Sequence, residues 1–288
     1  MTTPSVSGWL GGVHVGDSSP VRVVAVLNVS PDSFYGGSVA SDLDDLARRA
    51  EAAQREGADL VDVGAMSTRP LRHTAIPAEV EADRLTAAVA RVRSATDLPV
   101  SADTQRALPA AAAIDAGARV VNDVSGLHDD PRLARLVAER GVDLVVMARA
   151  LPPGRGAPVA RAARRLRASL RRATAAGIPI ERVTVDPGIG FTTAAEVSAT
   201  DWNLALLRDL ARLRRLGRPI LVGVSRKGFI GRLLGQPDPA DRLVGSLAAA
   251  AVAVFNGAHV VRAHDVAATR QAVRIAEAIR AGRSPLPQ

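Results

Sequence analysis

The feature that most constrains the fold is a repeated pattern, in which a helical stretch ends at glycine and a short apolar run follows. The segments EGADLVDVG, DAGARVVND, ERGVDLVVM and NGAHVVRAH share this design. Short and almost wholly apolar runs are typical of strands buried on both faces, as in a parallel sheet covered by helices. Glycine just after the last helical residue is a common helix end.

Eight such strands are predicted, and eight helices alternate with them. The strands are residues 22–27, 59–63, 99–102, 118–122, 142–147, 183–186, 219–224 and 258–262. The helices are residues 43–56, 78–95, 107–116, 132–140, 159–176, 202–216, 240–255 and 266–281. Alternating units without a break in composition predict an α/β chain with a single (β/α)8 TIM barrel; a doubly wound open sheet is the alternative.

The predicted barrel covers residues 22–282. Residues 1–21 are expected to form a short N-terminal extension, which could be a hairpin that closes the bottom of the barrel. Residues 283–288 are expected to be a frayed C-terminal tail.

Composition limits both the chemistry and the location of the chain. The absence of cysteine excludes disulfides, thiolate metal sites and cysteine nucleophiles. No apolar run reaches about 18 residues and no signal peptide is recognisable, so we expect a cytoplasmic protein that does not enter a membrane. The arginine-rich stretch at 161–172 is expected to be a solvated helix face rather than a nucleic-acid surface, because aromatic residues are scarce.

Lys227 is the only lysine among 37 basic residues, which makes it a site candidate. A chain that carries nearly all its positive charge on arginine would be expected to replace a lysine that served only as surface charge. Arginine does not substitute for lysine where a compact ammonium donor is needed. Drift that left one lysine by chance is the alternative explanation.

Polar residues follow seven of the eight predicted strands. They include Asn28, Asp62, Asp103, Asn122, Asp186, Ser225, Lys227, Arg262 and His264. In a barrel, all strand ends of this kind converge on one rim, where active sites lie. A single Asp or Asn there more often caps the next helix, but the complete set, with its mixed charges and amides, predicts a binding site.

The candidate residues suit two chemically different parts of a ligand. Carboxylates, an amide and an ammonium suit the edge of an amino-pyrimidinone ring, which presents both donors and acceptors. This first set is Asp103, Asn122, Asp186 and Lys227. A cationic set suits a phosphorylated group, which many barrels bind near strand eight. This second set is Asn28, Arg69, Arg262 and His264.

A series of motifs in a fixed order makes the chain resemble the dihydropteroate synthases. The motifs are VLNVSPDSF (26–34), DVGAMSTRP (62–70), SADT (101–104), VVNDVSG (120–126), DPGIGF (186–191), VGVSRKGFIG (222–231) and RLVGSLAA…NGAHVVRAHDV (242–266). They span nearly the whole predicted barrel. Each motif alone would be weak, whereas the series is specific.

The resemblance implies a homodimeric transferase of folate biosynthesis, which joins 6-hydroxymethyl-7,8-dihydropterin diphosphate to 4-aminobenzoate. It implies Mg²⁺ as a cofactor, with Asn28 as a metal ligand. The implied pterin-binding residues are Asp103, Asn122, Asp186 and Lys227. The residues implied to meet the diphosphate or lie near it are Thr68, Arg69, Phe191, Ser225, Arg262 and His264. Phe34 and Pro70, on loops at 29–37 and 65–74, are implied to line the aryl-amine pocket.

The implied reaction begins with loss of diphosphate, which leaves a cation at the methylene carbon of the pterin. The amine then attacks this carbon. Such a reaction needs positioning of the reactants and stabilisation of the leaving group by arginine, protonated histidine and Mg²⁺. The implied catalytic residues are Arg69, Asp103, Lys227, Arg262 and His264.

The chain departs from the family pattern in four places. The departures are Tyr35 where the first loop is one residue shorter, Met66 in place of glutamate, Arg149 in place of the second methionine of Met-His-Met, and Thr192 after Phe191. They leave open a pterin-binding paralogue that is non-catalytic or uses a different aryl amine. A pterin-dependent methyltransferase is less compatible, since it would not need the Ser-Arg-Lys and Arg-x-His segments.

Overall fold

The computed structural model describes residues 5–29, 42–66, 76–149, 156–192 and 198–282. Eight parallel strands form one sheet in the order β8-β7-β6-β5-β4-β3-β10-β9. They are β3 (Arg22–Asn28), β4 (Leu60–Gly64), β5 (Val100–Asp103), β6 (Val120–Asp123), β7 (Asp143–Met147), β8 (Val183–Asp186), β9 (Leu221–Gly223) and β10 (Val260–Ala263). A parallel bridge between Val185 and Ile220 joins β8 to the segment leading into β9, so the barrel is nearly closed. The predicted TIM barrel is confirmed, and the open-sheet alternative is wrong.

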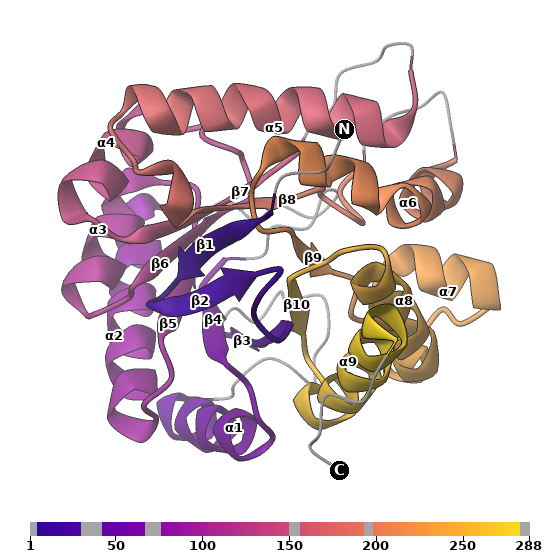
Figure 1. Ribbon diagram of the computed structural model, residues 1–288. Coiled ribbons are helices and arrows are strands. Elements are labelled where there is room, and N and C mark those ends of the chain that lie inside the picture. Colours follow the sequence, from indigo (N-terminus) through magenta and orange to yellow (C-terminus); the bar gives the residue numbers. More distant parts are fainter. Residues whose placement is uncertain (1–4, 30–41, 67–75, 150–155, 193–197, 283–288) are drawn as a thin grey trace.

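Nine α-helices in the described part of the chain surround the strands, as Figure 1 shows. They are α1 (Leu43–Arg55), α2 (Ala78–Ala95), α3 (Ala107–Asp115), α4 (Pro131–Arg140), α5 (Pro158–Ala175), α6 (Ala199–Arg208), α7 (Gly228–Leu234), α8 (Leu243–Phe255) and α9 (Val266–Ala281). Three 3-10 helices accompany them: η2 (Ile180–Arg182), η3 (Leu210–Leu216) and η4 (Pro239–Arg242). The apolar faces of the helices pack on the outside of the barrel and form the main core.

One predicted helix needs correction, and one observed helix is not among the predicted ones. The single helix predicted over 202–216 is in fact α6 followed by η3, because the chain leaves helical geometry at Asp209, where ψ is 12°. Helix α7 has no counterpart among the predicted helices, since seven residues are too few to reveal a helical period. This short helix follows Lys227 directly.

Helix α4 shows how the local sequence fixes the ends of an element. The Asp130 carboxylate accepts a hydrogen bond from the backbone N–H of Arg132 at 3.0 Å, and Pro131 occupies the first helical position. Both features are typical of helix starts. Gly141 ends the helix in the left-handed conformation, with a φ of 61°, as the recurring glycine predicts.

The predicted N-terminal hairpin is present and closes the bottom of the barrel. It consists of β1 (Ser7–Leu10) and β2 (Val13–Gly16), which pair antiparallel. The turn residue Gly11 donates its N–H to Oδ2 of Asp143 at 2.7 Å. Side chains of the hairpin and of the lower strand ends form a second apolar cluster of Leu10, Val15, Val24, Leu60, Val120, Val145, Leu221 and Val260. The site is therefore confined to the opposite end of the barrel.

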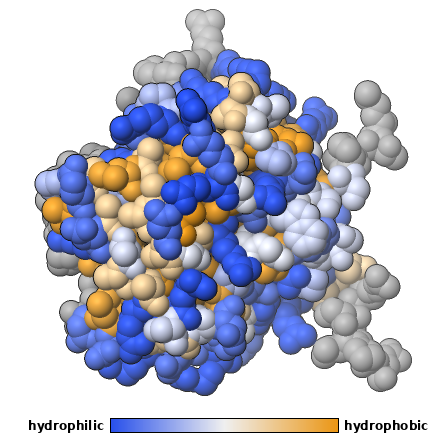
Figure 2. Space-filling model, turned by 90° about the vertical axis from the view of Figure 1, so that its left-hand side faces the viewer, coloured by the Kyte–Doolittle hydropathy of each residue, from blue (hydrophilic) through white to orange (hydrophobic). Residues whose placement is uncertain are grey.

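The boundaries of the barrel domain at residues 22 and 282 stay a prediction, and the tail at 283–288 lies outside the described residues. Among the described helices, none is both long and apolar enough to cross a bilayer. Figure 2 views the side of the molecule on which α2 and α3 lie, where hydrophobic residues are interspersed with hydrophilic ones. Interspersed apolar atoms are ordinary on the surface of a globular domain.

Candidate functional site

A buried polar network joins four strands, with three residues at or next to the carboxyl end of their strand and Asp62 in the middle of β4. Asp62 comes from β4, Asp103 from β5, Asn122 from β6 and Arg262 from β10. Their placement follows from strand register, which aligns Val61 with Val100 and Asp103 with Asn122 in neighbouring strands. Parallel pairing thus brings residues that are far apart in sequence onto the same rim.

Arg262 lies at the centre of this network. Its Nε donates to Oδ2 of Asp62 at 2.6 Å, and its Nη2 donates to Oδ2 of Asp103 at 2.9 Å. The side-chain amide of Asn122 donates to the same Asp62 oxygen at 3.0 Å. The arginine therefore binds two carboxylates, one of which the sequence assigns to the pterin. Arg262 of the second predicted set thus contacts Asp103 of the first.

Two carboxylate oxygens of the network are free to accept hydrogen bonds from a ligand. Oδ1 of Asp62 and Oδ1 of Asp103 are buried and receive no hydrogen bond from any described residue. Buried polar atoms in native proteins almost always have a partner, and an unpaired one destabilises the fold. Two such oxygens on neighbouring strands favour a ligand that presents N–H donors to them.

Burial shifts the protonation of the carboxylates at this site. It raises the pKa of Asp103 to about 7, an effect that Arg262 opposes and Asp62 reinforces. Burial also raises the pKa of Asp186 to about 6, against the opposing effects of the Gly188 N–H, Lys227 and Arg262. Both groups therefore change charge close to neutral pH.

Lys227 reaches this region from the loop that follows β9. Its Nζ lies 4.1 Å from the centroid of the Phe191 ring. Burial, followed by the charge of Arg262, lowers the pKa of Lys227 to about 8. Gly190 leaves space for the lysine: a Cβ at this residue, whose φ is +87°, would lie 2.8 Å from Cδ of Lys227. The segment DPGIGF thus forms the wall against which Lys227 packs.

These pKa shifts predict a bell-shaped pH dependence for binding of the pterin that the sequence resemblance implies. Below about pH 6 to 7, protonation of Asp186 and Asp103 removes acceptors for the ligand N–H groups, so affinity should fall as pH falls. Above about pH 8, loss of the Lys227 proton removes a donor, so affinity should fall again. Calorimetric titration with 6-hydroxymethylpterin from pH 5 to 9 measures this profile. Asp186→Asn should reduce the acid limb to the part set by Asp103, and an unaltered limb in that variant would contradict the assignment.

Ser225 and His264 form a second contact between the β9 and β10 loops. The distance between Ser225 Oγ and His264 Nδ1 is 2.9 Å, and the backbone N–H of His264 donates to the same hydroxyl at 3.2 Å. Burial, together with the charges of the neighbouring cations Arg262, Lys227 and Arg226, lowers the pKa of His264 to about 3. The imidazole is therefore neutral in the unliganded protein, and the expected protonated histidine, which concerns the state with diphosphate bound, stays a prediction.

Asn28 lies at the end of β3, next to the network. Its Oδ1 lies 3.0 Å from the position that a Cβ on Gly64 would take, and Asp103 borders the same position. Within the described ranges, no group of three or more His, Asp or Glu side chains is placed to hold a metal. The remaining sequence-predicted site residues, Phe34, Thr68, Arg69 and Pro70, lie outside the described residues.

Asp62 is a site residue that the sequence reasoning did not assign to the ligand. Asp62 is one of the polar residues near the strand ends in the sequence, but it belongs to neither of the two predicted ligand-binding sets. The signal available was a carboxylate inside the otherwise apolar strand LVDVG, since an ionised side chain is almost never fully buried unless it is paired. Its hydrogen bond to Arg262 shows the pairing.

Two of the residues that depart from the family pattern lie at the edge of the site, and each contacts another protein side chain. Arg149, after β7, donates from Nη1 to Oε1 of Gln105 at 2.7 Å. Met66, after β4, places its sulfur 3.7 Å from Nη2 of Arg106, which is bound in turn by Glu81. Neither side chain contacts Asp103 or Asn122 through a described hydrogen bond. These two departures therefore alter the border of the site and leave the polar network in place.

Comparison with known proteins gives a consistent result. A family model described as "Pterin binding enzyme" matches residues 24–264. The dihydropteroate synthase of Mycobacterium leprae is 40% identical over 270 residues, which cover 89% of this chain and 93% of the relative. The dihydropteroate synthase of Neisseria meningitidis serogroup C is 37% identical over 283 residues, covering 94% and 97%.

Solved structures agree with this similarity in three dimensions. The Xanthomonas albilineans dihydropteroate synthase with 4-aminobenzoic acid superposes with a TM-score of 0.85 at 36% identity, covering 99% of this chain and all of the other. The same enzyme in complex with 7,8-dihydropteroate gives a TM-score of 0.82 at 34% identity, with equal coverage. The Yersinia pestis enzyme with a sulfonamide drug complex gives 0.86 at 31% identity, covering 96% and 100%.

Proposed function

This chain belongs to the dihydropteroate synthase family of pterin-binding enzymes, and we propose that its barrel rim condenses 6-hydroxymethyl-7,8-dihydropterin diphosphate with 4-aminobenzoate. The products are dihydropteroate and diphosphate. The observation that carries the proposal is the pair of buried, unpartnered carboxylate oxygens on Asp62 and Asp103, beside the amide of Asn122. The 2-amino and ring N–H groups of a pterin are donors of the kind these oxygens lack.

The pterin would lie among Asp62, Asp103, Asn122, Asp186 and Lys227. The carboxylates would accept from its N–H groups, and the ammonium of Lys227 would donate to a ring nitrogen or the carbonyl. The Phe191 ring, 4.1 Å from Nζ, holds the lysine in place by a cation–π contact. The accepting carboxylates and the donating ammonium complement the donors and acceptors along the pterin edge. This supports a flat ligand that both donates and accepts hydrogen bonds.

The diphosphate would extend from the pterin toward the loops after β9 and β10. Ser225 and His264 are already in contact there, and Arg262, which binds the carboxylates of Asp62 and Asp103, lies close enough for its charge to lower the pKa of His264. The approach of a diphosphate would raise the low pKa of His264, because an anion stabilises the imidazolium form. His264 would therefore become a cation only when the leaving group is bound. Thr68 and Arg69 complete the proposed set.

Mg²⁺ fits this site as an ion that arrives with the diphosphate. Mg²⁺ is usually held by one or two protein oxygens together with substrate phosphates, rather than by a full protein cage. Asn28 supplies one such oxygen beside Asp103, and the described residues contain no three-ligand cluster. When bound, the ion would neutralise charge on the departing diphosphate.

The protein's main contribution to the reaction would be positioning. The bond between the methylene carbon and the diphosphate oxygen breaks, and a bond from the amine nitrogen to this carbon forms, with loss of an amine proton. Arg262, His264 and Ser225 would hold the leaving group, while the pterin contacts fix the methylene carbon in front of the amine. The rigid strand ends suit this role, since they keep the groups at fixed spacing.

We further propose that the protein is cytoplasmic and forms a homodimer. The supporting observation for the dimer is a set of exposed apolar side chains on the neighbouring helices α7 and α8. They are Leu233, Leu234, Val244, Val252 and Phe255, of which Val244 is 76% exposed. Exposed apolar side chains in such number favour a protein–protein contact. The mass of the protein in solution, measured by light scattering, tests this proposal.

Diphosphate release tests the proposed reaction. Purified protein would be mixed with Mg²⁺, the dihydropterin diphosphate and 4-aminobenzoate, with controls that each lack one component. We expect release that requires all three. Tight pterin binding without any release would contradict the proposal, and would instead support a non-catalytic paralogue or a different aryl amine.

A further inference from the structure

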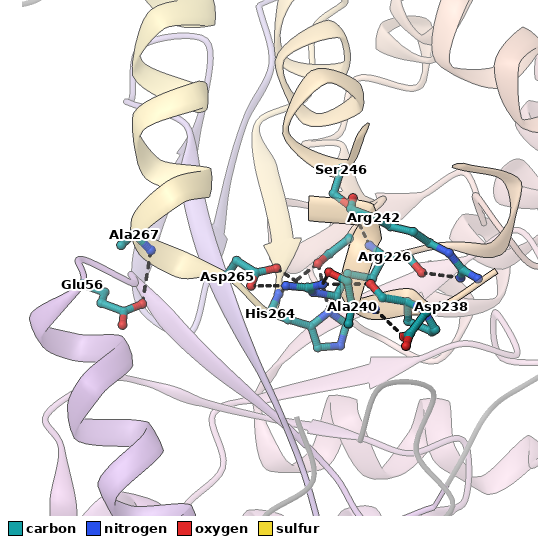
Figure 3. A network of polar contacts seen from close by, with 11 residues as sticks. Glu56, Arg226, Asp238, Ala240, Arg242, Ser246, His264, Asp265 and Ala267 are labelled. Carbon is teal, nitrogen blue, oxygen red and sulfur yellow. Dashed lines mark hydrogen bonds and ion pairs between the residues drawn. The ribbon is translucent and has the colours of Figure 1, made fainter. Parts of the chain in front are cut away.

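We propose that Arg226, which lies outside the ligand-binding set, is a positioning residue for the diphosphate site. Together with Asp265 it ties the loop after β9 to the loop after β10, and so fixes the spacing between Ser225 and His264, whereas Lys227 is held separately by its contact with Phe191. The inference rests on the proposed function, because Ser225 and His264 are proposed to hold the diphosphate. Figure 3 shows Arg226 and Asp265 beside His264.

The side chain of Arg226 is buried and forms a two-pronged ion pair. Its Nε donates to Oδ2 of Asp265 at 2.9 Å, and its Nη2 donates to Oδ1 at 2.7 Å. The third nitrogen, Nη1, donates to the carbonyl oxygens of Pro239 and Ala240 at 2.8 and 2.7 Å. The planar fork of arginine therefore joins three segments, which the single ammonium of lysine could not do in the same geometry.

The backbone of Arg226 is held as firmly as its side chain. Its N–H donates to Ser246 Oγ at 2.8 Å, and its carbonyl accepts from Nη1 of Arg242 at 3.1 Å. Ser246 in turn donates to the carbonyl of Arg242 at 2.6 Å. The start of α8 thus fixes the main chain at this residue (Figure 3).

This support maintains an uncommon backbone conformation between two site residues. The φ of Arg226 is +55°, in the left-handed region that residues other than glycine rarely adopt. The bend allows Ser225 to contact His264 and Lys227 to contact Phe191, while Arg226 itself points into the supporting network. Strained residues of this kind persist where the surrounding contacts hold them.

The ion pair between Arg226 and Asp265 lies beyond the point at which β9 and β10 stop pairing. The register of β9 with β10 runs from Leu221 to Gly223 on one strand and from Val260 to Arg262 on the other. His264 and Asp265 lie past that end, as do Ser225 and Arg226. Side-chain contacts, rather than the backbone ladder, therefore set the distance between the two loops.

The charge-preserving variant Arg226→Lys tests the proposal. We expect its affinity for inorganic diphosphate to fall about tenfold to 100-fold, as when a supporting partner of a ligand-binding side chain is removed. KM for the pterin diphosphate should rise in parallel. Affinity for 6-hydroxymethylpterin, which lacks the phosphates, should change less than about threefold. Titration calorimetry measures both probes.

A second variant, Asp265→Asn, separates positioning from electrostatics. It removes a negative charge near the diphosphate, which by charge alone would strengthen anion binding. We expect weaker binding of diphosphate instead, because the fork of Arg226 loses its partner. Stronger binding would overturn the proposal. This variant also keeps the inference testable if Arg226→Lys does not fold.

Arg214→Lys is the matched control. Arg214 forms a similar two-pronged pair with Asp17, at 2.7 and 2.8 Å, and Asp17 also contacts His259 just before β10 begins. This pair lies at the other end of the barrel, so both probes should bind the control as they bind the wild type. Equal losses for diphosphate and 6-hydroxymethylpterin in Arg226→Lys would overturn the proposal. A wild-type chain that bound neither probe would refute the proposed function itself, and this inference with it.

Discussion

Arg262→Ala is expected to lower kcat/KM by at least about 100-fold, comparable to the loss of one preorganised donor at a catalytic centre. Arg262 binds the carboxylates of Asp62 and Asp103 at 2.6 and 2.9 Å. Its removal leaves two buried carboxylates without their cation, and the proposed diphosphate site without one positive charge. Steady-state kinetics with varied pterin diphosphate measures the loss.

The same variant should weaken binding of both parts of the substrate. A cationic set separate from the pterin set, as the sequence suggests, would predict a loss for diphosphate and little change for the pterin. The geometry predicts otherwise, because Asp103 is proposed to receive the pterin and is oriented by Arg262. Calorimetry with 6-hydroxymethylpterin and inorganic diphosphate distinguishes the two outcomes. An unchanged pterin affinity would restore the model of separate halves.

Stability provides an independent readout for Arg262→Ala. Breaking a buried ion pair by removing one partner destabilises a protein by about 3–5 kcal/mol. The loss should be larger at pH 8 than at pH 5, because the pKa of Asp103 is about 7 and protonation at low pH relieves the unpaired charge. Urea denaturation of wild type and variant at both pH values tests this. A destabilisation that did not depend on pH would argue against ionised carboxylates at the pair.

The barrel could be predicted because its signal is local and repeated. Each glycine-terminated helix followed by an apolar run, such as the one ending at Gly141 and leading into β7, identifies one unit without reference to the others. Eight units then leave few topologies. The elements that were missed are those without a period: α7 is only seven residues long, and the change from α6 to η3 depends on the backbone at Asp209.

The membership of the site could be predicted, whereas its internal pairing could not. Asp103, Asn122 and Arg262 stand at strand ends in the sequence, so their convergence follows from the fold. The hydrogen bond from Arg262 to Asp62 joins residues 200 positions apart. It depends on the pairing of the last strand, β10, with the first barrel strand, β3. The neutral state of His264 likewise depends on tertiary structure, first on burial and then on the charges of three surrounding cations. Such properties are set by tertiary contacts and leave no trace in a local motif.

Lys227→Arg is expected to lower pterin affinity about tenfold to 100-fold, although it preserves the charge. The Nζ of Lys227 lies 4.1 Å from the centroid of the Phe191 ring, and the stem of the side chain fills the space that Gly190 leaves open. A guanidinium is larger and planar, so it would displace the ring or enter the space proposed for the pterin. Calorimetric titration with 6-hydroxymethylpterin measures the loss. Arg208→Lys, which alters an exposed pair with Asp209, is the control and should bind normally.

The alkaline limb of the pH profile gives this variant a second, sharper outcome. In the wild type, affinity should fall above about pH 8, where Lys227 loses its proton because burial and Arg262 have lowered its pKa. Arginine keeps its proton throughout this range. The weaker binding that remains in Lys227→Arg should therefore not fall between about pH 8 and pH 9, while the acid limb at lower pH, which depends on Asp186 and Asp103, is retained. If the variant bound the pterin as tightly as the wild type, the only lysine in the chain would be a chance survivor. If the alkaline limb persisted in the variant, another group would be responsible for it.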